Sequence, residues 1–126
     1  MSGVGRSVDH MVRPDEIREL ALTLPRTSVH IIHDRLKFRV GAIVYVALSR
    51  DETTMGFAFP KDERAALVAA EPDKFFMPSA SDMRFNWVQV RLDAIDRDEM
   101  AELVTEAWRM VVPKKVAAER LGRSPH

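Results

Sequence analysis

The sequence predicts an α+β protein built as a two-layer sandwich, with helices on one face of a mainly antiparallel sheet. Residues 27–60 alternate β-branched and aromatic residues with short polar breaks, which is typical of strands joined by hairpins. The segments on either side repeat apolar residues at helical spacing. The length of 126 residues suits one domain, which buries roughly two-thirds of the surface of its unfolded chain.

The first helix is expected over residues 14–24. Pro14 suits the first helical position, acidic Asp15 and Glu16 follow it, and Pro25 ends the apolar repeat. Residues 1–12 are small and polar without periodicity, so we expect a disordered tail, with Met11 as an alternative start of translation. Residues 123–126 are expected to fray, which leaves one domain over 13–122.

Four strands are expected next, over residues 27–33, 36–40, 42–49 and 54–60. Asp34 and Arg35 break the first pair, Gly41 makes a tight turn in the second, and the polar residues 50–53 separate the third. Such short connections imply antiparallel neighbours.

The second half of the chain returns to helices. Residues 61–71 favour a helix that Pro72 ends, and residues 73–84 form a loop that Phe75 and Phe76 pin to the core. A fifth strand follows over residues 85–92.

Two helices complete the chain. Asp96 is a good N-cap with Glu99 three residues later, and an apolar stripe that includes Trp108 runs on until Pro113. A short helix over residues 114–121 ends the domain, so the predicted order is α-β-β-β-β-α-β-α-α with five strands. We expect Trp108 to lie in the core, because an aromatic residue at helical spacing is usually packed inside.

Composition restricts the function. Basic and acidic residues balance at 19 each, so only local basic patches, within residues 26–50 and 109–126, can attract a polyanion. The absence of cysteine excludes disulfides, thiol nucleophiles and Cys-ligated metals. Without a long apolar stretch or a secretion signal, we expect a cytoplasmic monomer.

A basic and aromatic sheet face is the strongest candidate site. The strand period puts Lys37 and Arg39 opposite three apolar neighbours, and it puts Trp87, Gln89 and Arg91 on one side of the fifth strand. If the apolar residues point inward, these five side chains share the open face. Cations contact phosphates while an indole stacks on bases, although any solvated sheet face can also be charged.

The pair Lys114 and Lys115 is a second basic candidate. These lysines follow the break at Pro113. They either contact phosphates or stabilise the preceding helix, because positive charge interacts favourably with the carboxyl end of a helix dipole.

The sequence gives little support for a metal site or for a hydrolytic active site. His30, His33 and Asp34 carry metal-binding groups, but residues three apart on a strand point to opposite faces, which favours structural or exposed histidines. A His33–Asp34 hydrolase pair lacks a Gly-x-Ser-x-Gly elbow. We therefore expect no catalytic residues, no metal and no cofactor.

Three segments carry a resemblance to a known family. They are residues 36–41 (LKFRVG), 85–92 (FNWVQVRL) and 107–115 (AWRMVVPKK), and in this order they resemble the MmcQ/YjbR family over about residues 14–120. The resemblance implies a frataxin-like (CyaY-like) α/β sandwich and a DNA-binding protein acting through a winged, sheet-based surface. Unlike frataxin, the first helix has no dense acidic ridge, which argues against iron binding.

The function expected from these observations is non-enzymatic binding of double-stranded DNA through Lys37, Arg39, Trp87, Gln89 and Arg91, with Lys114 and Lys115 in support. The alternative is a module that binds a small molecule or a protein, using residues 72–84 and the face around Trp87.

Overall fold

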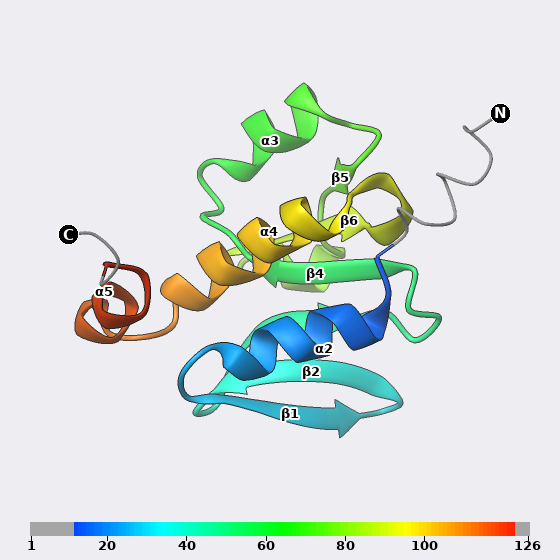
Figure 1. Ribbon diagram of the computed structural model, residues 1–126. Helices are drawn as coiled ribbons and strands as arrows, with labels where there is room; N and C mark the ends of the chain where they lie inside the picture. Colours follow the sequence, from blue (N-terminus) through cyan, green and yellow to red (C-terminus); the bar gives the residue numbers. More distant parts are fainter. Residues whose placement is uncertain (1–11, 123–126) are drawn as a thin grey trace, which may run out of the picture.

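The chain folds as a six-stranded antiparallel sheet with helices packed against one of its faces (Figure 1). The structure is a computed structural model and describes residues 12–122. The strands, in the spatial order β1-β2-β3-β4-β6-β5, are β1 (Thr27–Ile32), β2 (Arg35–Val40), β3 (Ile43–Leu48), β4 (Thr54–Ala58), β6 (Trp87–Arg91) and β5 (Phe75–Phe76). The helices are α2 (Pro14–Thr23), α3 (Arg64–Ala70), α4 (Arg97–Arg109) and α5 (Lys114–Gly122). The predicted α+β class is confirmed.

The predicted strand count was one too low. Within the segment predicted as a loop, Phe75 and Phe76 form β5, which pairs with β6 through Phe75 opposite Val90 and Phe76 opposite Gln89. A strand of two residues is too short to show an alternating pattern in the sequence. The order along the chain is therefore α-β-β-β-β-α-β-β-α-α.

Helices α2 and α4 form the second layer. Figure 1 shows both running across the same side of the sheet, with α3 near the β5–β6 edge and α5 beyond the carboxyl end of α4. None of the helices in the described part of the chain is long and apolar enough to cross a membrane.

The core lies between this layer and the sheet. Strand residues such as Phe38, Phe57 and Val90 belong to the same buried cluster as Val104 and Trp108 of α4, and all five are fully buried or nearly so. Burial of each such side chain stabilises the fold by about 1.5–3 kcal/mol. The indole Nε1 of Trp108 donates to the carbonyl of Pro25 at 2.9 Å, so the predicted core position of Trp108 is confirmed and its polar atom is satisfied.

The domain begins one residue earlier than predicted. Val12, which was assigned to the disordered tail, is buried, and its N–H donates to the carbonyl of Leu92 at 3.2 Å. A lone apolar residue before a helix gives no periodic signal, so the sequence did not reveal this contact. The rest of the predicted tail, residues 1–11, and the predicted frayed end, residues 123–126, lie outside the described residues.

The turns follow the residues that favour left-handed backbone. His33 and Asp34 have φ angles of 53° and 65° and link β1 to β2, which places the turn one residue before the predicted break at Asp34 and Arg35. Two consecutive positive φ angles give the twist that a two-residue hairpin needs. Gly41, with φ of 62°, makes the predicted tight turn between β2 and β3.

Candidate functional site

The sheet face opposite α2 and α4 gathers most of the predicted site residues. Directly paired residues of antiparallel strands point to the same face. The register pairs Lys37 with Ala47, Ala47 with Gly56 and Gly56 with Gln89, so these residues form one row across β2, β3, β4 and β6. Trp87, opposite Ala58, lies in the neighbouring row. Arg39 and Arg91 share the face through the alternation of their strands.

A groove of about 590 Å³ opens on this face. Its lining combines cations, small and aliphatic side chains, and the segment that precedes β6; the residues are Arg35, Lys37, Ile43, Val44, Ala47, Ala58, Asp82, Phe85, Asn86, Trp87, Met110 and Val111. Sites of this volume with mostly apolar walls and a few polar groups are typical of ligand-binding pockets. Of the predicted residues, the groove brings together Lys37 and Trp87.

Gly56 allows the indole of Trp87 to lie on the sheet. A Cβ atom at position 56 would stand 2.5 Å from the Trp87 Nε1 atom and 2.8 Å from its Cε2 and Cζ2 atoms. These separations are shorter than real carbon contacts, so any side chain here would displace the ring. Gly56 thus determines the position of the indole beside the groove, a role that strand patterning did not indicate.

A β-bulge in β3 shapes the floor of the groove. The register changes from Phe38 opposite Val46 to Arg39 opposite Val44, which leaves Tyr45 as an extra residue. Because of this insertion Val44 and Ala47, three residues apart, both line the groove, while Tyr45 and Val46 are both fully buried. Strict alternation along residues 42–49 did not predict this arrangement.

The hydroxyl group of Tyr45 has a hydrogen-bond partner inside the core. Its hydroxyl lies 2.7 Å from Thr27 Oγ1. Burial disfavours the phenolate and raises the pKa of Tyr45 to about 12, against a smaller opposite effect of the Thr27 hydrogen bond.

The two arginines of β2 are held in place by neighbours on adjacent strands. Arg35 Nε donates to the carbonyl of Leu48 at 3.1 Å, which fixes the guanidinium beside the groove. An amino nitrogen of Arg39 lies 3.1 Å from His30 Nε2, and that imidazole nitrogen lies 2.9 Å from Ser28 Oγ. His30 is therefore a side-chain partner of Arg39, and sequence analysis missed both it and Arg35.

The remaining predicted residues lie away from the groove. The Arg91 guanidinium covers the ring of Phe76 at 4.7 Å and is exposed, and Gln89 is half-buried in the row beside Phe76. Lys114 and Lys115 are exposed on the first turn of α5, which is not part of the sheet face. They begin α5, in agreement with the short helix predicted over residues 114–121.

A buried arginine supports the wall of the groove. Arg64, only 6% exposed, donates to the carbonyls of Phe85 at 2.9 Å and Trp87 at 3.1 Å, and also to that of Met83. Three carbonyl acceptors compensate the burial of its charge and hold the backbone that carries Phe85 and Trp87. The sequence offered no signal for this role, because an arginine in an alanine-rich helix is ordinarily solvated.

Apolar side chains stand exposed at the rim of the groove. Ile43 is 55% exposed, Phe85 50% and Met110 41%. The guanidinium carbon of Arg84 lies over the Phe85 ring, 4.7 Å from its centroid. The rim thus offers both apolar surface and positive charge.

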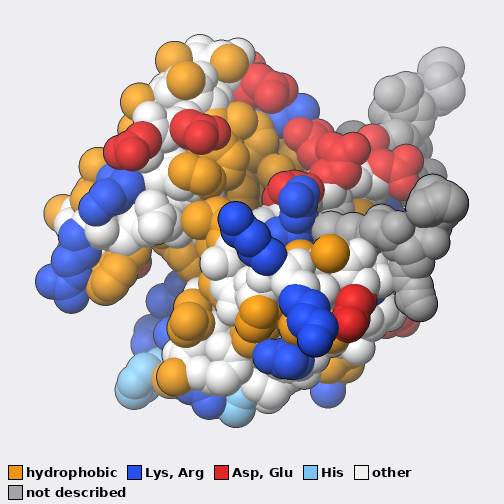
Figure 2. Space-filling view, turned by 90° about the vertical axis from the view of Figure 1, so that its left-hand side faces the viewer, with side chains coloured by type: hydrophobic (Ala, Val, Ile, Leu, Met, Phe, Trp, Pro, Cys, Tyr) orange, Lys and Arg blue, Asp and Glu red, His pale blue; other side chains and the backbone are white. Residues whose placement is uncertain are grey.

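The distribution of charge can be followed in Figure 2, where Lys and Arg side chains lie on both sides of an indentation at the left margin of the molecule, with a histidine at its lower side.

Within residues 12–122 no group of three His, Asp or Glu side chains is arranged to hold a metal ion. His33 is exposed in the β1–β2 turn, and His30 contacts Ser28 and Arg39.

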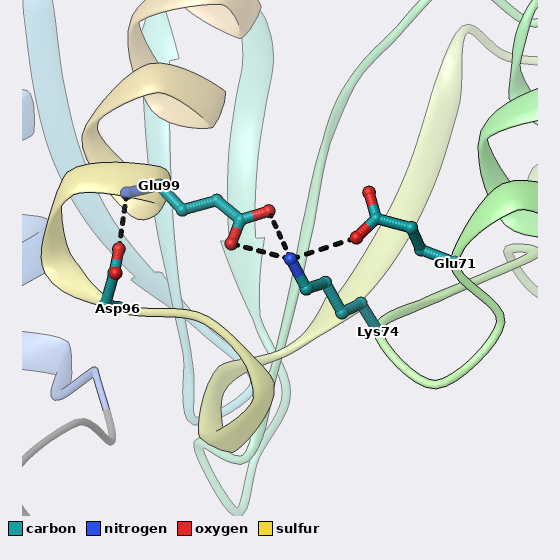
Figure 3. Close-up of polar contacts among 4 residues, drawn as sticks. All are labelled: Glu71, Lys74, Asp96 and Glu99. Carbon is teal, nitrogen blue, oxygen red and sulfur yellow. Dashed lines mark hydrogen bonds and ion pairs between the residues drawn. The ribbon is translucent and has the colours of Figure 1, made fainter.

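A polar cluster ties the β5 edge of the sheet to α4 (Figure 3). Lys74 Nζ lies 2.9 Å from Glu99 Oε1 and 3.0 Å from Glu71 Oε1. Hydrogen bonds to these two carboxylates, Glu99 first, raise the pKa of Lys74. Asp96 Oδ1 accepts from the backbone N–H of Glu99 at 2.8 Å, which confirms the predicted N-cap.

The fold and the face together define a small α+β sandwich protein with an open, grooved antiparallel sheet. In a comparison with models of known protein families, the model described as YjbR matches residues 22–110 of this chain. The chain therefore belongs to the YjbR family, as its sequence segments indicated.

The fold is shared with protein DR2400 of Deinococcus radiodurans, whose crystal structure carries the domain DUF419. The two chains superpose with a TM-score of 0.71 at 20% identity, and the similarity covers 89% of each. Among curated proteins nothing matches the chain.

Proposed function

We propose that this protein binds DNA through the open sheet face, as a cytoplasmic monomer without catalytic activity. The observation that carries the proposal is the strand register, which places Lys37, Arg39 and Trp87 on one face beside a groove with Arg35 in its lining. Lysine and arginine contact phosphates, and an indole packs against sugars and bases. The lining offers the cations Arg35 and Lys37, one carboxylate (Asp82), one amide (Asn86) and apolar surface rather than a paired nucleophile and base, which supports binding over catalysis.

Arg39 adds a specific argument. Its Nε atom is buried and meets no acceptor within the described residues. Because this atom is covered, a phosphate would be attracted by the charge of the guanidinium, which His30 holds on the sheet face, and not by the Nε atom itself.

The test is fluorescence anisotropy with a labelled duplex of mixed sequence, titrated at several salt concentrations. Affinity should fall steeply with salt, and Lys37→Gln should weaken binding and reduce the salt slope by about one. Arg18→Gln removes the same charge from an exposed position on α2, on the opposite side of the sheet, and should leave binding unchanged. The proposal is wrong if no DNA binds at low salt, or if both variants weaken binding equally.

A second candidate function, binding of a small molecule or a protein, is favoured by the volume and apolar rim of the groove. A thermal-shift screen of metabolites would detect a ligand that binds the folded state. A compound that raises the melting temperature of the wild type but not of Trp87→Leu would support this alternative. Binding of DNA without any such compound would dismiss it.

A further inference from the structure

We propose that the groove holds one unstacked nucleobase of a single strand, so that the protein prefers single-stranded to double-stranded DNA. This inference rests on the proposed function and specifies its ligand. It starts from the contrast between the groove, which has aromatic and aliphatic walls, and the cations beside it.

A duplex would leave this groove unfilled. Duplex DNA stacks its bases inside and presents phosphates, sugars and base edges, which need cations and polar groups. The Trp87 indole lies over the backbone of β4 at Gly56, so it forms part of a surface rather than a wedge that enters a groove of the duplex. A flat ring fixed in this way is suited to a partner whose own ring is exposed.

A single strand exposes such rings. Bases stack on aromatic side chains with little dependence on sequence, because every base has a π face. The groove supplies Trp87, the rim adds Phe85 and Met110, and Val44 and Ala58 form small apolar parts of the lining. The volume of about 590 Å³ is ample for one base with its sugar.

Three polar residues of the lining suit the rest of a nucleotide, and with Asp82 as the single carboxylate the two cations leave the lining with a net positive charge. Arg35, oriented through its bond to Leu48, and Lys37 supply positive charge for the phosphate. Asn86 uses its side-chain oxygen to accept from the Lys61 N–H at 2.9 Å, which leaves its amide hydrogens to donate to the edge of a base.

The experiment compares three labelled probes of equal length: a single strand, the corresponding duplex, and a single strand that carries abasic sites. The wild type should bind the unmodified single strand most tightly, because it offers more unstacked bases to the groove than the other two probes. Trp87→Leu should weaken this binding by about 5- to 150-fold, the usual contribution of one stacked base, and should change duplex binding little. Trp87→Phe retains an aromatic face and should retain most of the affinity.

Further variants separate stacking from charge. Gly56→Ala should act like Trp87→Leu, because its Cβ atom displaces the indole. Lys37→Gln should weaken binding of all three probes, and thermal melting of each variant checks that it is folded.

The outcomes are distinguishable. Equal affinity for the single strand and the duplex, or for the normal and abasic strands, would overturn the inference while DNA binding itself stands. Because the abasic comparison uses the wild type, it decides the question even if a variant fails to fold. If none of the probes binds, the proposed function fails.

Discussion

At the scale of single residues, Arg64 and Tyr45 are buried polar groups whose environments have measurable consequences. The Arg64 guanidinium donates hydrogen bonds to three backbone carbonyls and not to a carboxylate. Tyr45 keeps its hydroxyl neutral beside Thr27. Both lie close to the groove, Arg64 behind its wall and Tyr45 behind its floor.

Arg64→Ala should lower the free energy of unfolding by about 2–4 kcal/mol, because it leaves three backbone carbonyls without their donor and removes a buried side chain. Urea unfolding measures the change. Arg18→Ala, at an exposed position, should change stability by less than about 0.5 kcal/mol. An equally small effect of Arg64→Ala would show that its carbonyl contacts are not important for folding.

Tyr45 should make stability depend on pH at the alkaline end. Its folded pKa of about 12 exceeds its unfolded value, so its contribution is complete below about pH 10 and is lost as the pH rises towards 12. The difference of about two pKa units corresponds to about 3 kcal/mol. Since the chain has one tyrosine, the ultraviolet spectrum of tyrosinate reports this group directly.

The titration midpoint should lie near 12 in the folded protein and near 10 in urea. Tyr45→Phe should lose stability less steeply than the wild type between these pH values. A folded-state midpoint near 10 would contradict the assigned burial of the hydroxyl.

At the scale of elements, the start of α4 has the N-cap that its sequence predicts. Asp96 caps the helix through the N–H of Glu99, whose carboxylate binds Lys74 beside β5 (Figure 3). The backbone of Glu99 therefore takes part in the cap, while its side chain links α4 to the sheet edge.

Asp96→Ala should destabilise the protein by about 1 kcal/mol, because one N–H at the first turn of α4 loses its acceptor. Thermal or urea unfolding measures this loss. Asp96→Asn keeps a capping oxygen and should recover most of the stability, whereas Glu102→Ala, an exposed change on the same helix, should have little effect. Equal losses for alanine and asparagine would argue against the cap.

At the scale of the whole molecule, one core joins residues from both ends of the described chain. It runs from Val12 through the sheet to Val116 and Ala117 of α5. Elements that share one core are expected to unfold together.

Fluorescence and far-ultraviolet circular dichroism should therefore give coincident unfolding transitions. In Trp87→Phe, the fluorescence comes from Trp108, which is fully buried near the carboxyl end of α4, so it reports the core alone. A separate early transition seen by circular dichroism would show that a part such as α5 unfolds independently.

Sequence reasoning identified most of the fold for a physical reason. Strands and helices with one buried face repeat apolar residues with periods of two and 3.6, and the segments around Phe38 and Trp108 keep these repeats. The residues Gly41 and Pro14 mark a turn and a helix start through their own backbone geometry. Elements that depend on contacts elsewhere, such as β5, left no such pattern.

The candidate site, like the fold, could be predicted from the sequence only in part. Alternation along single strands was enough to assign Lys37, Arg39, Trp87, Gln89 and Arg91 to one face, because side-chain direction in a strand is a local property. Which of them meet at a groove was decided by register, by the bulge at Tyr45 and by the absence of a side chain at Gly56. Those features arise from pairing between strands and from the space left between side chains, so only the tertiary structure determines them.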